Sequence, residues 1–271
     1  MTWTALATAV AAQWLAFAAV MAVAWVAQQR TRNSGWVDVS WTFGLGAIAA
    51  AAALVTSAGQ AISERQILVG LLVAVWSLRL GLQIVQRTLN TDDDPRYADL
   101  ARQWGDAAPA RMFGLLQIQA IASVPLLASV FVAANRPGPL GLADLLGAGL
   151  MVAAIAGEGI ADRQLWAFRR AAGHSGQVLQ QGLWRYSRHP NYFFQWLGWL
   201  AYAAIAIDLS GAYPFGWIAL TGPICMYVLL VHVSGIPPLE AHMLRSRGDA
   251  YRAYQARTSA FFPLPPRAPN E

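Results

Sequence analysis

The sequence contains no lysine and only one cysteine, and charge of either sign is scarce. All 19 basic residues are arginine, and charged residues make up 12% of the 271 residues. The single cysteine, Cys225, excludes an intramolecular disulfide and a cysteine metal cluster. A soluble domain usually carries about 25% charged residues. So little charge therefore indicates a protein embedded in a membrane.

Common motifs for nucleotides, metals and nucleic acids are also missing. The chain has no GxGxxG and no GxxxxGK[ST] pattern, and its four histidines lie in different segments without HExxH spacing. A nucleotide, if one binds, is therefore not held by a Rossmann domain, and we expect no metal site. The net charge of +5 needs no nucleic acid as partner, because the arginines gather where apolar stretches end.

Long apolar stretches fill most of the chain. Hydrophobic residues make up 56% of the sequence, and seven stretches approach the roughly 20 residues that a bilayer requires. They are residues 3–28, 39–59, 66–86, 112–134, 140–161, 191–208 and 213–233. The sequence thus predicts an all-α polytopic membrane protein with seven transmembrane helices, forming a single domain over residues 1–271. We expect the first stretch to be a retained helix, because its positive charges follow it.

The positions of the arginines predict the orientation. Most arginines follow the first, third, fifth and seventh stretches, whereas the even loops hold only Arg65 and Arg136. The positive-inside rule then places the N-terminus outside and the C-terminus in the cytoplasm. Because every basic residue is arginine, the residue type is weak evidence of ligand binding, and position is better evidence.

The most informative segment is LWRYSRHPNYFFQWLGW, residues 183–199. Within seven residues it supplies Arg185, Tyr186, Arg188, His189 and Asn191 directly before an apolar stretch. Such donors hold phosphorylated or otherwise anionic ligands. The proline after the histidine is well placed near the first turn of the next helix, whose N-terminal end favours anions. The alternative is a basic membrane-flanking loop that only sets topology.

Two spans carry polar side chains in their interior. Asp38 lies near the start of the second span, and Arg79, Gln83 and Arg87 lie on roughly one face of the third. A carboxylate in a membrane is costly, so we expect Asp38 to be paired or solvated. Asp38 either acts on the substrate or pairs with an arginine such as Arg79. The polar stripe is either a cavity wall or part of ion pairs between helices.

Five segments carry a resemblance to a known family. They are NSGWVDVSWTFG (33–44), WSLRLGLQIVQR (76–87), DDDPRYADLARQWG (92–105), RYSRHPNYFFQW (185–196) and SGIPPLEAHMLRSRGDAYRAYQARTSAFFP (234–263). Together they resemble the membrane steroid 5α-reductase-like proteins, particularly their bacterial branch, over nearly the whole chain. The RHPNY core is also similar to that of isoprenylcysteine carboxyl methyltransferases, but the other segments favour the reductases.

The resemblance implies an NADPH-dependent reductase in the bacterial cell membrane, which delivers hydride to the β-carbon of an enone such as a 3-oxo-4-ene steroid. Phosphates of NADPH require guanidinium groups on the cytoplasmic side. The cofactor-binding candidates are Arg87, Arg96, Arg102, Asp162, Arg169, Arg185, Tyr186, Arg188, His189, Asn191, Tyr254 and Arg257. Among them, Asn191 is expected at the nicotinamide carboxamide and Asp162 at the ribose or adenine.

The catalytic candidates are Asp38, Arg79 and Gln83, and the substrate-binding candidates are Trp41, Glu158 and Gln195. The chain departs here from the steroid-reducing members. Their Gln–Glu pair in the second span and their Tyr in the third are not evident, and Gln195 stands where relatives usually carry Glu. Enone reduction needs an acid near the carbonyl, so the proton donor and the lipidic substrate stay open.

The tail and the function class each have alternatives. Glu240, Arg247, Tyr251, Tyr254 and Arg257 recur at helical spacing, on a segment that either closes over the cofactor or lies on anionic lipid. A membrane methyltransferase using S-adenosylmethionine, or a lipid-binding protein without activity, are the other two function classes. In all three, the expected partners are a lipidic small molecule and membrane lipid.

Overall fold

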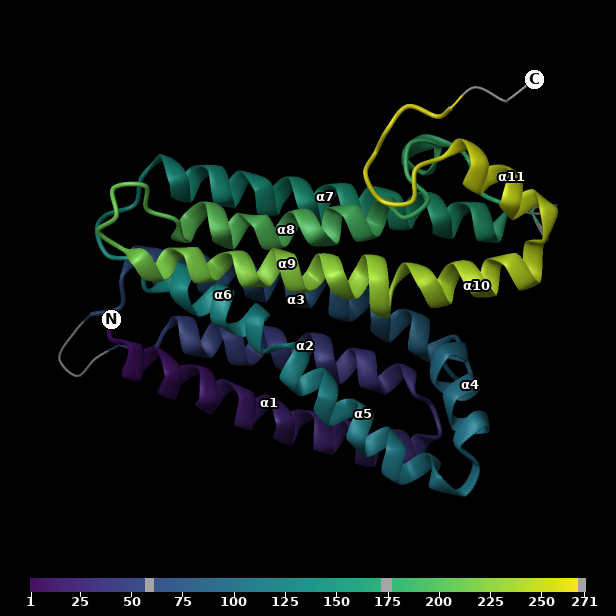
Figure 1. Cartoon of the computed structure of the whole chain (residues 1–271), viewed down its shortest axis with the longest axis horizontal. Coiled ribbons are helices and arrows are strands. Elements are labelled where there is room, and N and C mark those ends of the chain that lie inside the picture. Colours follow the sequence, from purple (N-terminus) through teal and green to yellow (C-terminus); the bar gives the residue numbers. More distant parts are fainter. Residues whose placement is uncertain (57–60, 172–176, 268–271) are drawn as a thin grey trace. The chain divides into compact units, whose positions relative to one another are not determined.

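The computed structural model describes residues 1–56, 61–171 and 177–267, and these residues form helices and loops without a strand (Figure 1). The predicted all-α class is confirmed. Contacts divide the chain into two compact units. The first unit comprises residues 1–145 and 202–222, and the second comprises residues 146–201 and 223–271. The interpretation as a single domain stays a prediction.

Six helical segments within the described residues are long and apolar enough to cross a membrane. They are Trp3–Thr31, Gly35–Ala53, Glu64–Leu89, Arg96–Ala134, Leu142–Arg170 and Pro214–Arg247. These segments identify an integral membrane protein. The remaining predicted span, 191–208, corresponds to helix α8 (Pro190–Ala206), which has only 17 residues. Seven spans and the orientation therefore stay predictions.

The first unit is built on three long helices, α1 (Trp3–Thr31), α2 (Gly35–Ala53) and α3 (Glu64–Leu89). Small residues let α2 and α3 approach closely, as in many membrane helix pairs. A Cβ atom on Gly46 would lie 2.2 Å from the Ser77 side chain, and one on Gly81 would lie 2.5 Å from the Phe43 ring. This antiparallel pairing brings the start of α2 beside the end of α3.

The predicted fourth span, residues 112–134, is divided between the last two helices of the stretch that follows α3. The chain forms α4 (Pro95–Trp104), the 3₁₀ turn η1 (Gly105–Ala107), α5 (Ala108–Ala122) and α6 (Val124–Ala134). The break falls at Ser123, because Pro125 has no N–H to continue the helical hydrogen bonds. The Ser123 hydroxyl instead donates to the carbonyl of Gln119 at 2.8 Å and accepts from the Trp41 indole at 3.0 Å.

Both arginines of the even loops are bound within the first unit. Arg65 and Asp144 form a buried ion pair, with 2.7 Å between Nε and Oδ1 and 2% and 1% of their side chains exposed. Arg65 also donates to the carbonyls of Arg136 and Pro139 at 2.6 Å. The Arg136 guanidinium donates to the carbonyl of Ile205 at 2.8 Å. Neither arginine is therefore a free positive charge at this end of the helices.

The second unit contains most of α7 (Leu142–Arg170) and α8, joined by a loop with the 3₁₀ turn η2 (Gly182–Arg185). Within this unit α7 and α8 pack closely, since a Cβ atom on Gly157 would lie 2.3 Å from the Phe194 ring. The loop is fixed on α7 because the Trp184 indole donates to the carbonyl of Ala161 at 3.0 Å. The start of α8 is thereby held in place.

The last segments of the second unit are α9 (Thr221–Val228), a π turn η4 (Leu229–Val233), α10 (Ile236–Arg247) and α11 (Asp249–Arg257). The 3₁₀ turn η3 (Pro214–Leu220) precedes them in the first unit. The tail is predicted as one helical segment but is two helices, because Gly248 adopts a φ of 53° that ends α10. Beyond α11, Phe261 packs edge-on against Trp196 and Tyr227.

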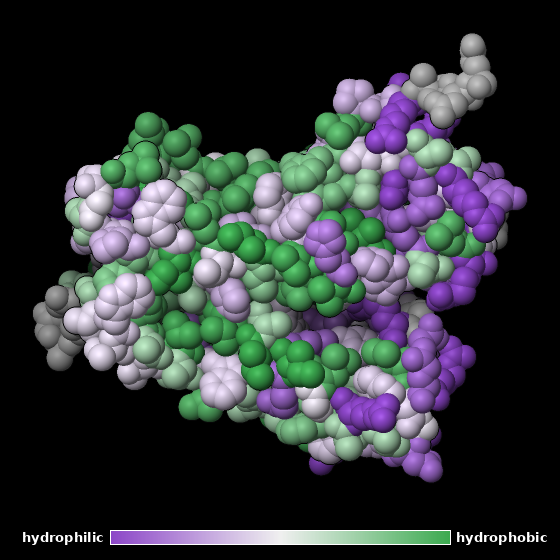
Figure 2. Space-filling model, in the orientation of Figure 1, coloured by the Kyte–Doolittle hydropathy of each residue, from purple (hydrophilic) through white to green (hydrophobic). Residues whose placement is uncertain are grey.

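Hydrophobic residues cover the long helices of each unit, as expected for surfaces that face lipid (Figure 2). Hydrophilic residues gather over α4 in the first unit and over α11 in the second (Figure 2). The predicted site residues lie largely near these polar ends.

Candidate functional site

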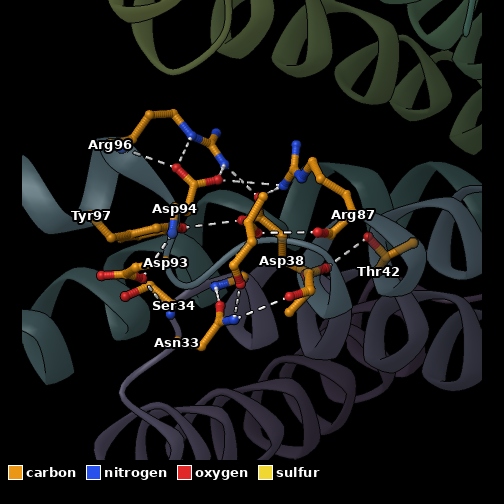
Figure 3. Close-up of polar contacts among 12 residues, drawn as sticks. Asn33, Ser34, Asp38, Thr42, Arg87, Asp93, Asp94, Arg96 and Tyr97 are labelled. Atoms are coloured by element: carbon orange, nitrogen blue, oxygen red, sulfur yellow. Dashed lines mark hydrogen bonds and ion pairs between the residues drawn. The ribbon is translucent and has the colours of Figure 1, made fainter. Parts of the chain in front are cut away.

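The first unit contains a charge cluster formed by Asp38, Arg87, Asp94 and Arg96 (Figure 3). Nη2 of Arg96 donates to Asp38 at 2.5 Å and to Asp94 at 2.8 Å. Nη2 of Arg87 donates to the same two carboxylates at 3.1 and 3.4 Å. Two guanidinium groups thus face two carboxylates, so the four charges of the cluster sum to zero.

Local structure around two loops explains why the cluster forms. Asp94 caps the N-terminus of α4, where its side chain accepts from the backbone N–H of Arg96 at 3.0 Å. Asn33 donates to the carbonyl of Thr91 at 2.8 Å, and the Ser34 N–H donates to Asp93 at 2.7 Å (Figure 3). These bonds join the α1–α2 loop to the α3–α4 loop.

The electrostatics of Asp94 follow from these contacts. Burial alone would raise the pKa of Asp94, but the hydrogen bond and charge of Arg96, with the charge of Arg87, outweigh burial and hold the pKa below its usual value. Asp94 is therefore a stable anionic anchor for both arginines.

Tyr97 is a member of this site that the sequence reasoning missed. Its buried hydroxyl donates to Asp38 at 3.2 Å and accepts from the Gln119 amide at 3.0 Å. The available signal was its place directly after Arg96, in the helix that Asp94 caps. Asp38 therefore accepts bonds from two guanidinium groups and one phenol.

The other predicted residues of the first unit are not among those joined by the bonds described above. Arg79 and Gln83 are half-buried on α3. Trp41 contacts Ser123 at the helix break. Arg102 is exposed and pairs with Asp99 one turn earlier on α4. The structure thus brings together Asp38, Arg87 and Arg96 from the predicted set.

In the second unit, Arg188 connects the loop before α8 to α10 and α11. Its Nε and Nη2 donate to Glu240 at 2.7 and 3.2 Å, and its Nη1 donates to the carbonyls of Gln255 and Thr258 at 3.2 and 2.5 Å. Its backbone N–H donates to the carbonyl of Ser259 at 2.8 Å. Four of its five side-chain N–H groups are in use, so Arg188 has little capacity left for an anionic ligand.

His189 lies against the same carboxylate. Its Nε2 is 3.0 Å from Oε1 of Glu240, and its ring stacks on Tyr192 with an angle of 11° between the planes. Burial is the main cause that lowers the pKa of His189; the charge of Arg188 lowers it further, and Glu240 only partly opposes them. His189 is therefore neutral at physiological pH.

Five more predicted residues lie on α7 and α8 in the second unit. The Asn191 amide donates to Asp162 across the two helices at 3.4 Å. Glu158 and Gln195 are buried on the same helices. Arg169 is exposed near the end of α7.

Arg185 and Arg257 share a cavity that we call the arginine pocket. The pocket has a volume of about 200 Å³ and is lined by Gln180, Arg185, Arg257, Thr258 and Pro266. Neither arginine side chain forms an ion pair or a hydrogen bond with any residue that the structure describes. Two cationic groups therefore face one hollow without a counter-charge.

The remaining two candidates, Tyr186 and Tyr254, connect the loop that carries Arg185 to α11 and to the tail. The buried Tyr254 hydroxyl donates to the carbonyl of Trp184, which holds α11 against the η2 turn. Tyr186 is 43% exposed, and its carbonyl accepts from the N–H of Leu264 at 3.0 Å. The tail thereby runs along the loop that carries Arg185. In the described ranges, no group of three His, Cys, Asp or Glu residues could hold a metal ion.

Comparison with known proteins places the chain in a family without giving it an activity. No curated protein and no solved structure matches it. The family model described as "Protein of unknown function (DUF1295)" matches residues 24–258. Since this match covers most of the chain, the protein belongs to the DUF1295 family.

Proposed function

We propose that the protein is an NADPH-dependent membrane reductase, which transfers a hydride to the β-carbon of a lipidic enone. The observation that carries this proposal is the arginine pocket, in which Arg185 and Arg257 lack a counter-charge. The resemblance of five segments to the steroid 5α-reductase-like proteins supports the reaction class. It also makes a 3-oxo-4-ene steroid the first substrate to try.

The arginine pocket has the chemistry of a phosphate site. Guanidinium groups bind phosphate oxygens through paired, charge-assisted hydrogen bonds. The Gln180 amide and the Thr258 hydroxyl add neutral polar groups. A cavity of about 200 Å³ is smaller than the space around a whole drug-sized ligand. We therefore assign it to one phosphate group of NADPH, and the 2′-phosphate is the group that NADH lacks.

Other residues of the second unit offer neutral and acidic contacts. Asp162 can accept hydrogen bonds from ribose or adenine, and the Asn191 amide can bind a carboxamide. Arg188 uses four of its five N–H groups on Glu240 and two carbonyls, so we assign it the role of holding the loop in place. Bound NADPH supplies the hydride, and these residues orient it.

The charge cluster of the first unit receives a different role. Asp38 accepts from Arg87, Arg96 and Tyr97, so it serves as an acceptor that positions the two arginines. A carboxylate with these three donors is poorly suited to protonating an enolate. We therefore propose a positioning role for Asp38 in place of a direct catalytic one.

The thermal stability of detergent-purified protein tests the function class. Selective ligand binding raises apparent stability in proportion to the logarithm of one plus the ratio of free ligand concentration to dissociation constant. We expect a clear upward shift with NADPH, a smaller one with NADH and none with S-adenosylmethionine, which has no phosphate for the pocket. A shift with S-adenosylmethionine alone would assign the protein to the methyltransferases, and no shift with any of the three would favour a lipid-binding protein.

A further inference from the structure

A buried ring nitrogen of His189 has no hydrogen-bond partner. Only 2% of the residue is exposed, and Nδ1 contacts no donor or acceptor among the residues that the structure describes. An unsatisfied buried polar atom costs about 1–3 kcal/mol. Such an atom in a loop otherwise rich in hydrogen bonds calls for a partner beyond the described residues.

The contacts of Glu240 fix which ring nitrogen carries the proton. Oε1 of Glu240 accepts from Nε of Arg188 and lies 3.0 Å from Nε2 of His189. Oε2 accepts from Nη2 of Arg188 and from the Gln255 amide at 2.7 Å. A carboxylate can only accept, so Nε2 donates. In the neutral ring, Nδ1 is then an acceptor with a free lone pair.

The surroundings of Nδ1 select the class of ligand group. Its lone pair repels phosphate oxygens and enone carbonyls, and it attracts N–H or O–H donors. The ring also stacks on Tyr192, with 5.4 Å between the centroids, which makes a flat, partly apolar environment. The arginine pocket provides for phosphate elsewhere in the same unit. A flat heterocycle with an amide group supplies the donor that Nδ1 attracts, and it fits the flat, partly apolar surroundings of the ring.

We propose that Nδ1 of His189 accepts a hydrogen bond from the carboxamide N–H of the nicotinamide ring. This inference rests on the proposed reductase function and makes His189 a specificity-determining residue. Nδ1 has no exposed surface in the structure, so binding requires the side chains around His189 to move. Glu240 acts through His189, by fixing the tautomer.

Cofactor analogues that each lack one donor test the assignment. The 3-acetylpyridine analogue of NADPH has no carboxamide N–H, and the hypoxanthine analogue has no adenine amino group. For the wild-type protein we expect roughly tenfold weaker binding of the acetylpyridine analogue than of NADPH, as for a lost hydrogen bond to a buried acceptor. The hypoxanthine analogue serves as the matched comparison, and calorimetry gives the dissociation constants.

Two variants connect the effect to Nδ1. His189→Phe keeps a flat ring against Tyr192 but removes both nitrogens, and it should abolish the roughly tenfold discrimination against the acetylpyridine analogue. Gln255→Met also removes one donor from Glu240 but leaves Nδ1 in place, so discrimination should persist. If His189→Phe does not fold, ¹⁵N NMR of the wild-type histidine gives the same answer, because the Nδ1 signal should move on NADPH binding.

The outcomes separate this inference from the proposed function. If NADPH does not bind the wild-type protein at all, the proposed function fails. If NADPH binds and His189→Phe changes discrimination only for the hypoxanthine analogue, Nδ1 faces the adenine, and the nicotinamide assignment is wrong. If discrimination is the same in both proteins and the Nδ1 signal does not move, a buried water is the partner, which also overturns the inference.

Discussion

The charge cluster and the arginine pocket place the same residue type at helix ends, but they differ in charge balance. In the cluster, Arg87 and Arg96 meet Asp38 and Asp94. In the pocket, Arg185 and Arg257 meet only neutral groups. A ligand anion must compete with protein carboxylates in the first case and has no competitor in the second. The balance of charge, more than the number of arginines, therefore distinguishes a structural ion-pair cluster from a site that binds a ligand.

The largest expected effect comes from removing both cations of the pocket. Arg185→Ala combined with Arg257→Ala should weaken NADPH binding by about 100-fold or more, because each charged hydrogen bond contributes about 1.5–3 kcal/mol. Calorimetric titration in detergent measures the change. Arg252→Ala is the matched control, since Arg252 lies on the same helix and pairs with exposed Asp249. An equal loss in the control would contradict a specific role for the pocket.

The second effect concerns stability, and it tests the claim that Arg188 is structural. Glu240→Ala leaves Arg188 and His189 without their shared carboxylate in a largely buried place. Breaking a buried pair in this way costs about 3–5 kcal/mol. The melting temperature of the ligand-free protein should fall strongly, whereas the double variant of the pocket should melt as the wild type does. A Glu240→Ala protein of unchanged stability would show that Arg188 is not held by this pair.

The third prediction concerns a variant that gives the charge cluster an excess of positive charge, as in the arginine pocket. Asp38→Asn leaves two arginines against one carboxylate and should lower stability by only about 1 kcal/mol, because Arg87 and Arg96 are 49% and 38% exposed. The variant should also gain affinity for inorganic pyrophosphate, measured by its effect on melting temperature. Absence of any gain would mean that charge balance alone does not decide ligand binding.

The smallest effect is the pH dependence of stability. His189 has a folded-state pKa below its ordinary value of 6.5, so the unfolded chain binds more protons between the two values. Its contribution is fully present above pH 6.5 and is lost as pH falls below it. Asp94 likewise stabilises above its ordinary pKa of 3.8 and loses this effect at lower pH. Melting curves from pH 8 to pH 5 should show a decline that His189→Phe reduces.

Sequence reasoning predicted the membrane class and named many of the residues that lie in the polar clusters, because both follow from local composition. It grouped Arg185 with Arg188, which are only three residues apart. It could not foresee that Arg188 meets Glu240, 52 residues later, while Arg185 faces the pocket. That distinction depends on how α10 and α11 fold back, which the spacing along the chain does not encode.

The helix breaks and the role of Tyr97 were not predicted from the sequence, and each omission has a physical reason. Gly248 was a readable signal, since glycine tolerates a positive φ, but the regular spacing of Arg247, Tyr251 and Tyr254 favoured one helix. The π turn at Leu229–Val233 has no simple sequence signal. Tyr97 was missed because its importance comes from Asp38, on a helix 59 residues earlier.

A structure of the detergent-purified protein with NADPH bound tests the central claim most directly. The account predicts a phosphate group within hydrogen-bond distance of both Arg185 and Arg257, with the charge cluster of the first unit still paired as Asp38, Arg87, Asp94 and Arg96. A nucleotide whose phosphates instead displace Asp38 and Asp94 from Arg87 and Arg96, with the arginine pocket empty, would contradict it.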